Sequence, residues 1–141
     1  MTDCIFCAIV AGTAPSVVVA EDERTLAFMD INPVSDGHLL VIPKAHSADL
    51  LDILPEDLTA VTLTAQRLAR DAVDEFGADG VNLLNSCGAD AWQTVFHFHL
   101  HVIPHYLDKT RDRLPALPWT PEVPGDRDLI LSLGSRLAAA V

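Results

Sequence analysis

The chain has 141 residues, of which 50% are hydrophobic and 21% are charged, and its formal net charge is -11. A chain of this length is typical of one domain that buries its own core without disulfide bonds, and its composition is that of an ordinary globular protein, not a disordered or repetitive one. The negative charge repels polyanions, which argues against nucleic acid or an anionic membrane as a partner.

The sequence also predicts where the protein resides. No run approaches the ~18 consecutive apolar residues of a membrane span, and the first residues lack the basic start of a signal peptide. The three cysteines, an odd number, fit a reducing compartment better than a disulfide framework. Together these features predict a cytoplasmic protein.

The first part of the chain predicts three strands. Apolar and β-branched residues at 17–20 and 25–29, separated by a charged turn, are typical of a hairpin. Turn-forming residues then lead into 39–42, a continuous apolar run that is typical of a strand buried on both faces. After this strand, Ser47 is expected to cap a short helical turn that continues through Ile53.

A longer helix is predicted from Pro55 to Phe76. Proline suits the first helical position, acidic residues follow it in the first turn, and Gly77 provides the stop. The apolar residues between these ends fall at helical spacing and predict one buried stripe, which consists of Leu58, Val61, Ala65, Leu68, Ala69, Ala72, Val73 and Phe76.

The last part of the chain predicts two more strands and a final helix. Residues 81–84 are typical of a core strand, which we expect to pair with a strand at 95–104 after the loop at 85–92. Beyond Tyr106 the composition becomes rich in proline. Asp126 then predicts the cap of a helix that ends at Ala140.

Three histidines alternate with apolar residues in the segment 95–104. The period of two predicts a strand that carries His97, His99 and His101 on one face. The other face enters the core with Phe96, Phe98, Leu100 and Val102. No packing requirement explains three titratable rings in a row on one face, so we expect that face to be functional.

A shared metal ion is the first interpretation of these three histidines. Same-face neighbours on a strand lie about 6.7 Å apart, whereas a zinc-nitrogen bond is about 2.0 Å long. Two adjacent histidines can therefore share one ion, but three in a straight strand cannot. At least one imidazole remains available as a base or nucleophile near neutral pH.

The segment 97–103 matches the His-φ-His-φ-His-φ-φ signature of the histidine-triad (HIT) superfamily of nucleotide hydrolases and transferases. Gln93-Thr94 precede it as the family pattern expects, and residues 28–33 and 37–46 resemble the family's ribose-binding strand, turn and second strand. The likeness covers residues 4–106 in the family's own order, and chance matches to several linked motifs are rare.

The resemblance and the order of the segments imply an α+β fold in one domain. Its antiparallel sheet has about five strands, and it has two main helices. Residues 1–106 form the HIT domain, and residues 107–141 form a proline-rich segment and a short helix that packs on the same domain. Members of the family pair into a symmetric dimer, so we expect a homodimer of the bacterial Hint-like branch, which has an amino-terminal Cys-x-x-Cys.

The resemblance also assigns roles to the triad. His99 is the nucleophile that attacks the α-phosphorus of a nucleotide ester, anhydride or phosphoramidate, and water resolves the nucleotidyl-histidine intermediate. His101 hydrogen-bonds a phosphate oxygen or the leaving group. Gln93 and Thr94 are expected to donate to the same oxyanion.

Other residues are assigned to nucleotide binding. Asp30 either forms the turn before Asn32 or accepts hydrogen bonds from both ribose hydroxyls, and the resemblance favours the ribose. Phe28 and Ile31 line the base pocket or belong to the core. Asn85 approaches the nucleotide phosphate or is a turn residue at a strand end.

Cys4 and Cys7 allow a redox dithiol, half of a zinc site or two incidental thiols. Their place at the amino terminus, with no strand before them, disfavours the redox role. In members of the superfamily with this pair, His46 and His97 complete a structural Zn²⁺ site, which the resemblance implies here. His97 would then anchor the catalytic strand while the metal stays outside the chemistry.

Two residues depart from the family pattern, and two others have no partner that the sequence identifies. Trp92 stands where glycine is usual, which bears on the role of Gln93. His105 stands where arginine is common and is either a weaker phosphate contact or a surface residue. We expect Cys87 and His38 to be structural.

The sequence therefore predicts hydrolysis or transfer of a nucleoside monophosphate group, AMP or GMP, from a small phosphoramidate or phosphoanhydride. Two other functions remain open. One is a mononuclear metal enzyme that uses two triad histidines and an acid such as Asp90. The other is an adaptor that binds a nucleotide without turnover. The leaving group and the preferred base depend on the shape of the pocket.

Overall fold

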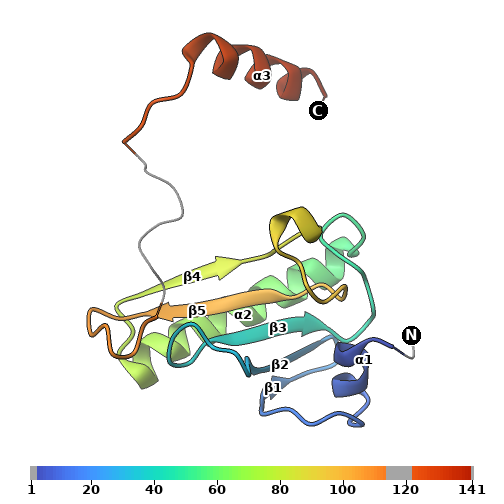
Figure 1. The fold of residues 1–141 in the computed structure, drawn as a ribbon. Helices are drawn as coiled ribbons and strands as arrows, with labels where there is room; N and C mark the ends of the chain where they lie inside the picture. The colour runs from blue at the N-terminus through green and yellow to red at the C-terminus, as the bar shows by residue number, and fades with distance from the viewer. Residues whose placement is uncertain (1–2, 114–121, 141) are drawn as a thin grey trace.

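A computed structural model describes residues 3–113 and 122–140 of the protein. The strands are β1 (Val18–Glu21), β2 (Thr25–Met29), β3 (Leu39–Pro43), β4 (Gly80–Leu84) and β5 (Leu100–His105). The helices are α1 (Ile5–Val10), α2 (Pro55–Phe76) and α3 (Arg127–Ala140), with a 3-10 turn η1 at Ala89–Ala91. The strands form one antiparallel sheet in the order β1-β2-β3-β5-β4, and α2 crosses one face of it (Figure 1). The predicted α+β fold is confirmed.

The centre of the sheet follows from the apolar runs. β3 is buried along its whole length, because β2 and β5 flank it and both of its faces are covered. In the register of β2 and β3, Met29 lies opposite Leu39. The ladder continues one step further, where the Asp30 N–H donates to the carbonyl oxygen of His38 at 3.1 Å. This register places two polar residues side by side at the end of the hairpin.

Helix α2 has the predicted bounds. Gly77 ends it with a φ of 68°, a left-handed conformation that glycine adopts without steric cost. Most of the predicted stripe packs on the sheet, with Val61, Ala65, Leu68 and Ala72 buried. The stripe is narrower than predicted at its end, since Val73 and Phe76 are 45% and 41% exposed.

Two strand predictions require correction. β4 is not a core strand but the edge of the sheet, and Leu83 and Leu84 are 46% and 39% exposed because only β5 flanks it. The histidine strand begins at Leu100 and not at Val95. The preceding segment turns toward another loop, where the Phe98 N–H donates to the carbonyl oxygen of Ser47 at 2.7 Å. Phe96 is consequently 49% exposed and lies outside the predicted core.

The predicted helical turn after β3 is a hydrogen-bonded turn without a helix. Ser47 does not cap it. Asp49 does so instead, because its Oδ1 accepts from the N–H groups of Leu51 and Asp52 at 2.9 and 3.1 Å. An aspartate two residues further on is the better acceptor, since a carboxylate can take two backbone donors.

The carboxy-terminal part has two distinct halves. Residues 111–113 return to the loop after β2, where the Arg113 N–H donates to the carbonyl oxygen of Val34 at 2.7 Å. α3 begins as predicted, with Asp126 Oδ1 accepting from the Leu129 N–H at 3.0 Å. α3 has no buried residue and lies apart from the sheet (Figure 1), so the packing of residues 107–141 on the domain stays a prediction. Residues 114–121 of the proline-rich segment lie outside the described residues.

None of the helices in the described ranges combines the length and the apolar character that a membrane span requires.

Candidate active site and metal centre

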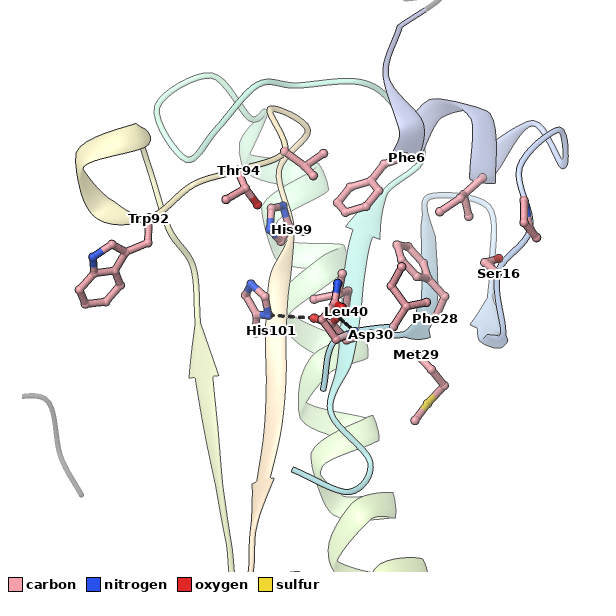
Figure 2. A pocket seen from close by; sticks show the side chains of 15 residues that line it. Phe6, Ser16, Phe28, Met29, Asp30, Leu40, Trp92, Thr94, His99 and His101 are labelled. Atoms are coloured by element: carbon pink, nitrogen blue, oxygen red, sulfur yellow. Dashed lines mark hydrogen bonds and ion pairs between the residues drawn. The ribbon is translucent and has the colours of Figure 1, made fainter. Parts of the chain in front are cut away.

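A cavity of about 310 Å³ opens where α1 meets the adjoining ends of β2, β3 and β5 (Figure 2). This volume lies at the lower end of the range for small-molecule sites. Fifteen residues line it: Phe6, Ile9, Pro15, Ser16, Phe28, Met29, Asp30, Ile31, Asn32, Leu40, Trp92, Thr94, Val95, His99 and His101. Six of the predicted site residues are among them, whereas His97, Asn85 and Gln93 are not.

His99 is the imidazole best prepared for nucleophilic attack. Its Nδ1 lies 2.8 Å from the carbonyl oxygen of His97, and a carbonyl only accepts, so Nδ1 carries the proton. Nε2 therefore keeps its lone pair. Burial lowers the pKa of His99 below the usual 6.5, although the bond to His97 and the charge of Asp30 oppose the shift. The ring is neutral near pH 7 and lines the cavity.

The proton on His101 is assigned by a chain of hydrogen bonds from the backbone. The Val34 N–H donates to Nδ1 of His38 at 3.1 Å, so His38 carries its proton on Nε2. That Nε2–H donates to Nδ1 of His101 at 2.9 Å. His101 in turn carries its proton on Nε2 and offers it as a donor at the cavity. Asp30 Oδ2 lies 3.4 Å from Nε2 of His38 and 3.9 Å from Nδ1 of His101.

Both rings of this chain are neutral near pH 7. Burial lowers the pKa of His38 below its ordinary value. The pKa of His101 is lowered to about 4, first by burial and then by the neighbouring rings of His99 and His38, while Asp30 opposes the shift. At neutral pH His101 is a hydrogen-bond donor and not a cationic acid.

His38 was predicted to be only structural, but it is buried beside the cavity and contacts His101. The two strands that position it were predicted, but their pairing was not. Once 25–29 pairs with 39–42, the register places residue 38 beside Asp30. A histidine facing an aspartate at the end of two buried strands is a candidate site pair, and only the pairing reveals it.

Gln93 has a different role from the predicted one. Its side chain is buried, and its amide donates to the carbonyl oxygens of Ala48 and Val95 at 2.7 and 3.1 Å. Its Oε1 accepts from the Gly88 N–H at 2.7 Å. Both amide hydrogens are therefore occupied, and Gln93 organises the loop without donating to an oxyanion.

Asn85 also supports the site from outside the cavity. Its Nδ2 donates to the carbonyl oxygen of His99 at 3.0 Å, which holds the backbone of His99 to the end of β4. Thr94, in contrast, is exposed and lines the cavity next to His99, so it is placed to donate to a phosphate oxygen.

The base-binding candidates lie on one side of His99. Phe28 belongs both to the core and to the cavity wall, whereas Ile31 is 87% exposed at the rim. Trp92 stands on the opposite side (Figure 2) with a φ of 72°, the left-handed region that glycine favours. His105 is remote from the cavity lining, and its Nδ1 lies 2.8 Å from Asp112 Oδ2.

The second cluster of ligand atoms joins α1 to the histidine segment. The Sγ atoms of Cys4 and Cys7 and the Nδ1 atoms of His46 and His97 all lie within 4.8 Å of one another. Nδ1 of His97 is 3.4 Å from Sγ of Cys4 and 3.5 Å from Sγ of Cys7. Two such ligands on one tetrahedral zinc would be about 3.6 Å apart. The spacing therefore fits a zinc ion.

The tautomer of His97 fits a metal as well. Its Nε2 lies 2.8 Å from the carbonyl oxygen of Pro43 and donates to it, which leaves the Nδ1 lone pair directed toward the two thiols. A backbone acceptor behind the ring is the usual support of a zinc-bound histidine. Asp90 lies in η1 and belongs to neither cluster of potential ligands in the described residues, which removes it from the metal-enzyme alternative.

A model of the HIT domain family matches residues 11–108. The chain belongs to the HIT family. A relative from Bacillus subtilis, "Protein hit", is 46% identical to this HIT protein over 104 residues, which cover 74% of this chain and 72% of the relative. Adenylylsulfatase HINT3 of Arabidopsis thaliana is 40% identical over 114 residues, which cover 81% of this chain and 56% of that protein.

Solved structures of HIT proteins extend the likeness to nearly the whole chain. A HIT family protein of Bacillus anthracis is 39% identical, with a TM-score of 0.87 over 99% of this chain and 97% of that one. A Zn-bound histidine triad protein of Mycobacterium smegmatis is 38% identical, with a TM-score of 0.73 over 99% of each chain. At the level of the family, the relatives support a hydrolase and a site that can hold zinc.

Proposed function

We propose that this HIT protein, as a member of the Hint-like branch, cleaves nucleoside phosphoramidates or phosphoanhydrides at the α-phosphorus through a nucleotidyl-His99 intermediate. The observation that carries the proposal is the bond from His99 Nδ1 to the His97 carbonyl, which leaves Nε2 unprotonated at the cavity. A neutral imidazole with a fixed lone pair is a competent nucleophile near pH 7.

In the proposed reaction, the Nε2 lone pair of His99 forms a bond to the α-phosphorus. The bond between phosphorus and the leaving group breaks, and the leaving group departs with the electron pair. Water then attacks the phosphorus, the bond to Nε2 breaks, and the nucleoside monophosphate is released with one proton given to solvent. Nε2–H of His101 and the hydroxyl of Thr94 support the phosphoryl oxygens in both steps.

The charges at the cavity favour a small, weakly charged substrate. Among the described residues that line it, none is lysine or arginine, and the one carboxylate is Asp30. Asp30 suits a ribose, because its two oxygens accept hydrogen bonds side by side. We infer that a purine mononucleotide with a small group on its α-phosphate, an AMP or GMP conjugate, fits better than a polyphosphate chain.

His101 further narrows the leaving group. Because burial holds its pKa near 4, it stabilises by hydrogen bonding and does not deliver a full proton at pH 7. A leaving group that departs as an anion, such as sulfate or carboxylate, needs no proton, whereas an amine takes one from solvent. We therefore expect adenosine 5'-phosphosulfate to turn over faster than an adenosine phosphoramidate. The name of the Arabidopsis relative, an adenylylsulfatase, agrees with this class.

The test is replacement of the nucleophile. We expect His99→Ala to lower kcat for an adenosine phosphoramidate by at least about 10³-fold, as for other covalent nucleophiles. His105→Ala is the matched control, since that histidine lies outside the cavity lining. Mass spectrometry of the quenched wild-type reaction should show a mononucleotide on His99. An active His99→Ala variant would refute the mechanism, and binding of AMP with no adduct would instead favour the adaptor.

We also propose a homodimer in which the apolar side chains of α3 pack against the partner chain. The helix exposes five large apolar side chains within this chain, and a helix of 14 residues is marginal without packing. These side chains are Leu129, Ile130, Leu131, Leu133 and Leu137. Light scattering should give about twice the 15.2 kDa of one chain, and Leu133→Asp with Leu137→Asp should lower that mass. A monomeric wild type would refute the dimer.

We also propose a cytoplasmic location, which the thiols support. Cys4, Cys7 and Cys87 are all free of disulfide bonds, and a reducing compartment keeps thiols in this form. The location stays a prediction.

A further inference from the structure

We infer that Phe6 couples the metal cluster to the nucleotide cavity, so that zinc and a mononucleotide bind to this protein with positive cooperativity. The inference rests on the proposed function, because it takes the cavity as the nucleotide site. It adds a role for the metal cluster that is neither catalytic nor merely structural.

Helix α1 depends on tertiary contacts to stay in place. This helix has only six residues, which is too short to be stable without tertiary contacts. Phe6 is its one buried residue. Ile9 and Val10 add partly buried contacts with the same apolar cluster. Cys4 and Cys7 provide a second kind of attachment, because their Sγ atoms face Nδ1 of His97 and Nδ1 of His46. The apolar contacts centred on Phe6 and the metal cluster are therefore the two anchors of α1.

Phe6 lies between the two thiols in the sequence. Cys4 caps the helix, since its Sγ accepts from the Cys7 N–H at 3.3 Å, and Phe6 lies within this turn. An ion bound by both thiols fixes the turn and with it the direction of the Phe6 side chain. Loss of the ion frees both thiols and removes one of the two anchors.

The Phe6 ring contacts both the nucleotide cavity and the metal cluster. It packs edge-on against His99 with the ring centroids 5.2 Å apart, and against Phe28 at 5.3 Å. The same ring meets the metal-facing His97 at 5.9 Å. Figure 2 shows Phe6 at the cavity between the nucleophile and the wall that contains Phe28. One aromatic ring thus touches the nucleophile, the base-side wall and a proposed metal ligand.

These contacts give a thermodynamic linkage. If zinc orders the wall that a nucleotide contacts, then a bound nucleotide must hold the metal-loaded form by the same factor. Couplings of this kind typically change affinity by about 5- to 150-fold. The result expected here is that AMP slows the loss of zinc and that zinc tightens the binding of AMP.

The experiment uses full-length zinc-loaded wild-type protein as the host, which keeps the contact between Phe6 and His99. AMP is the product of the proposed reaction, so turnover does not interfere. Zinc release to 4-(2-pyridylazo)resorcinol is followed by absorbance with and without saturating AMP. We expect AMP to slow release at least about 5-fold. In Phe6→Ala and Phe6→Leu, zinc stoichiometry should remain at one ion while the effect of AMP disappears. His105→Ala, which lies outside the cavity lining, should retain it.

The outcomes separate this inference from the proposed function. Calorimetry on the same host measures AMP binding directly. If AMP binds but does not slow zinc release, or slows it equally in Phe6→Ala, the coupling is wrong while the proposed function stands. If AMP does not bind to the zinc-loaded host, the cavity is not the nucleotide site and both fail. A folded preparation without zinc would also overturn the coupling.

Discussion

Two histidine clusters lie close together in this fold and differ in the atom behind the imidazole. In the metal cluster, the carbonyl oxygen of Pro43 accepts from Nε2 of His97, so the Nδ1 lone pair points at the thiols. In the second cluster, formed by Asp30, His38 and His101, the N–H of Val34 donates to Nδ1 of His38. The ligand atoms in each cluster lie within 4.8 Å of one another, so distance alone does not distinguish them.

The difference teaches that a single backbone group decides the chemistry of a histidine. A metal on Nε2 of His38 would move the ring proton to Nδ1, where it would oppose the Val34 N–H. Two donors would then face each other across 3.1 Å. The carbonyl of Pro43 creates no such conflict for His97. We therefore expect the first cluster to bind zinc. We expect the second cluster to fix the tautomer of His101 through hydrogen bonds that begin at the backbone.

The largest expected effect comes from removing the metal cluster. Cys4→Ser with Cys7→Ser should abolish zinc binding and lower the free energy of unfolding by at least about 3 kcal/mol, because binding to the folded state alone stabilises it. Urea unfolding and elemental analysis measure the two effects. His38→Gln should keep one zinc per chain. A second equivalent of zinc that disappears in His38→Gln would contradict the comparison.

The next effect concerns the second cluster. His38→Ala should lower kcat/KM by about 10- to 100-fold, because His101 loses the donor that fixes its proton on Nε2. His38→Gln should recover part of the rate, since its amide can again donate toward Nδ1 of His101. Zinc content should not change in either variant. NMR of the imidazole nitrogens reports the tautomer of His101, and an unchanged tautomer in His38→Ala would remove the explanation.

The elements that local signals determine could be predicted from the sequence. Pro55 and Gly77 mark both ends of α2, and the apolar run of β3 marks a strand buried on both faces. The prediction for the segment before β5 was wrong, because the direction of this segment depends on a long-range hydrogen bond from Phe98 to Ser47. A period of two in the sequence does not reveal that the ladder starts only at Leu100.

The candidate site shows the same difference between residues that local motifs indicate and residues whose roles depend on long-range contacts. His99, His101 and Asp30 were predicted because their motifs are contiguous in sequence, and the structure brings all three to one cavity. Gln93 was misassigned because its hydrogen bonds run to Ala48 and Gly88, which no local pattern indicates. The tautomers of the imidazoles likewise depend on backbone groups remote in sequence.

The pH dependence of the free energy of unfolding should distinguish the two clusters further. The pKa of His101 is near 4 in the fold and about 6.5 when unfolded, so between these values the unfolded chain binds more protons. Stability should therefore fall by about 1–2 kcal/mol from pH 7 to pH 5. Asp30, His38 and His99 are the titratable groups that face this ring.

The measurement is urea unfolding at several pH values in the Cys4→Ser, Cys7→Ser background, which removes the acid sensitivity of zinc binding. His101→Asn should reduce the pH dependence in that background but not abolish it, because burial also lowers the pKa values of His38 and His99. If the slope between pH 7 and pH 5 were unchanged by His101→Asn, the low pKa of this ring would not be its source. Titration of His101 should make no contribution to the pH dependence of kcat/KM from pH 6 to pH 8, because this ring is neutral throughout that range.

The smallest expected effect lies at Trp92, which belongs to neither cluster although it lines the cavity between them and the solvent. Its φ of 72° costs an L-residue about 1 kcal/mol that glycine does not incur. Trp92→Ala keeps this strain and removes the indole, whereas Trp92→Gly removes both. The glycine variant should therefore be more stable than the alanine variant by about 1 kcal/mol in urea unfolding, with zinc content and the tautomer of His101 unchanged in each. If alanine were the more stable, the loop would not hold the left-handed conformation, and Gln93, one residue along, would not be fixed as described.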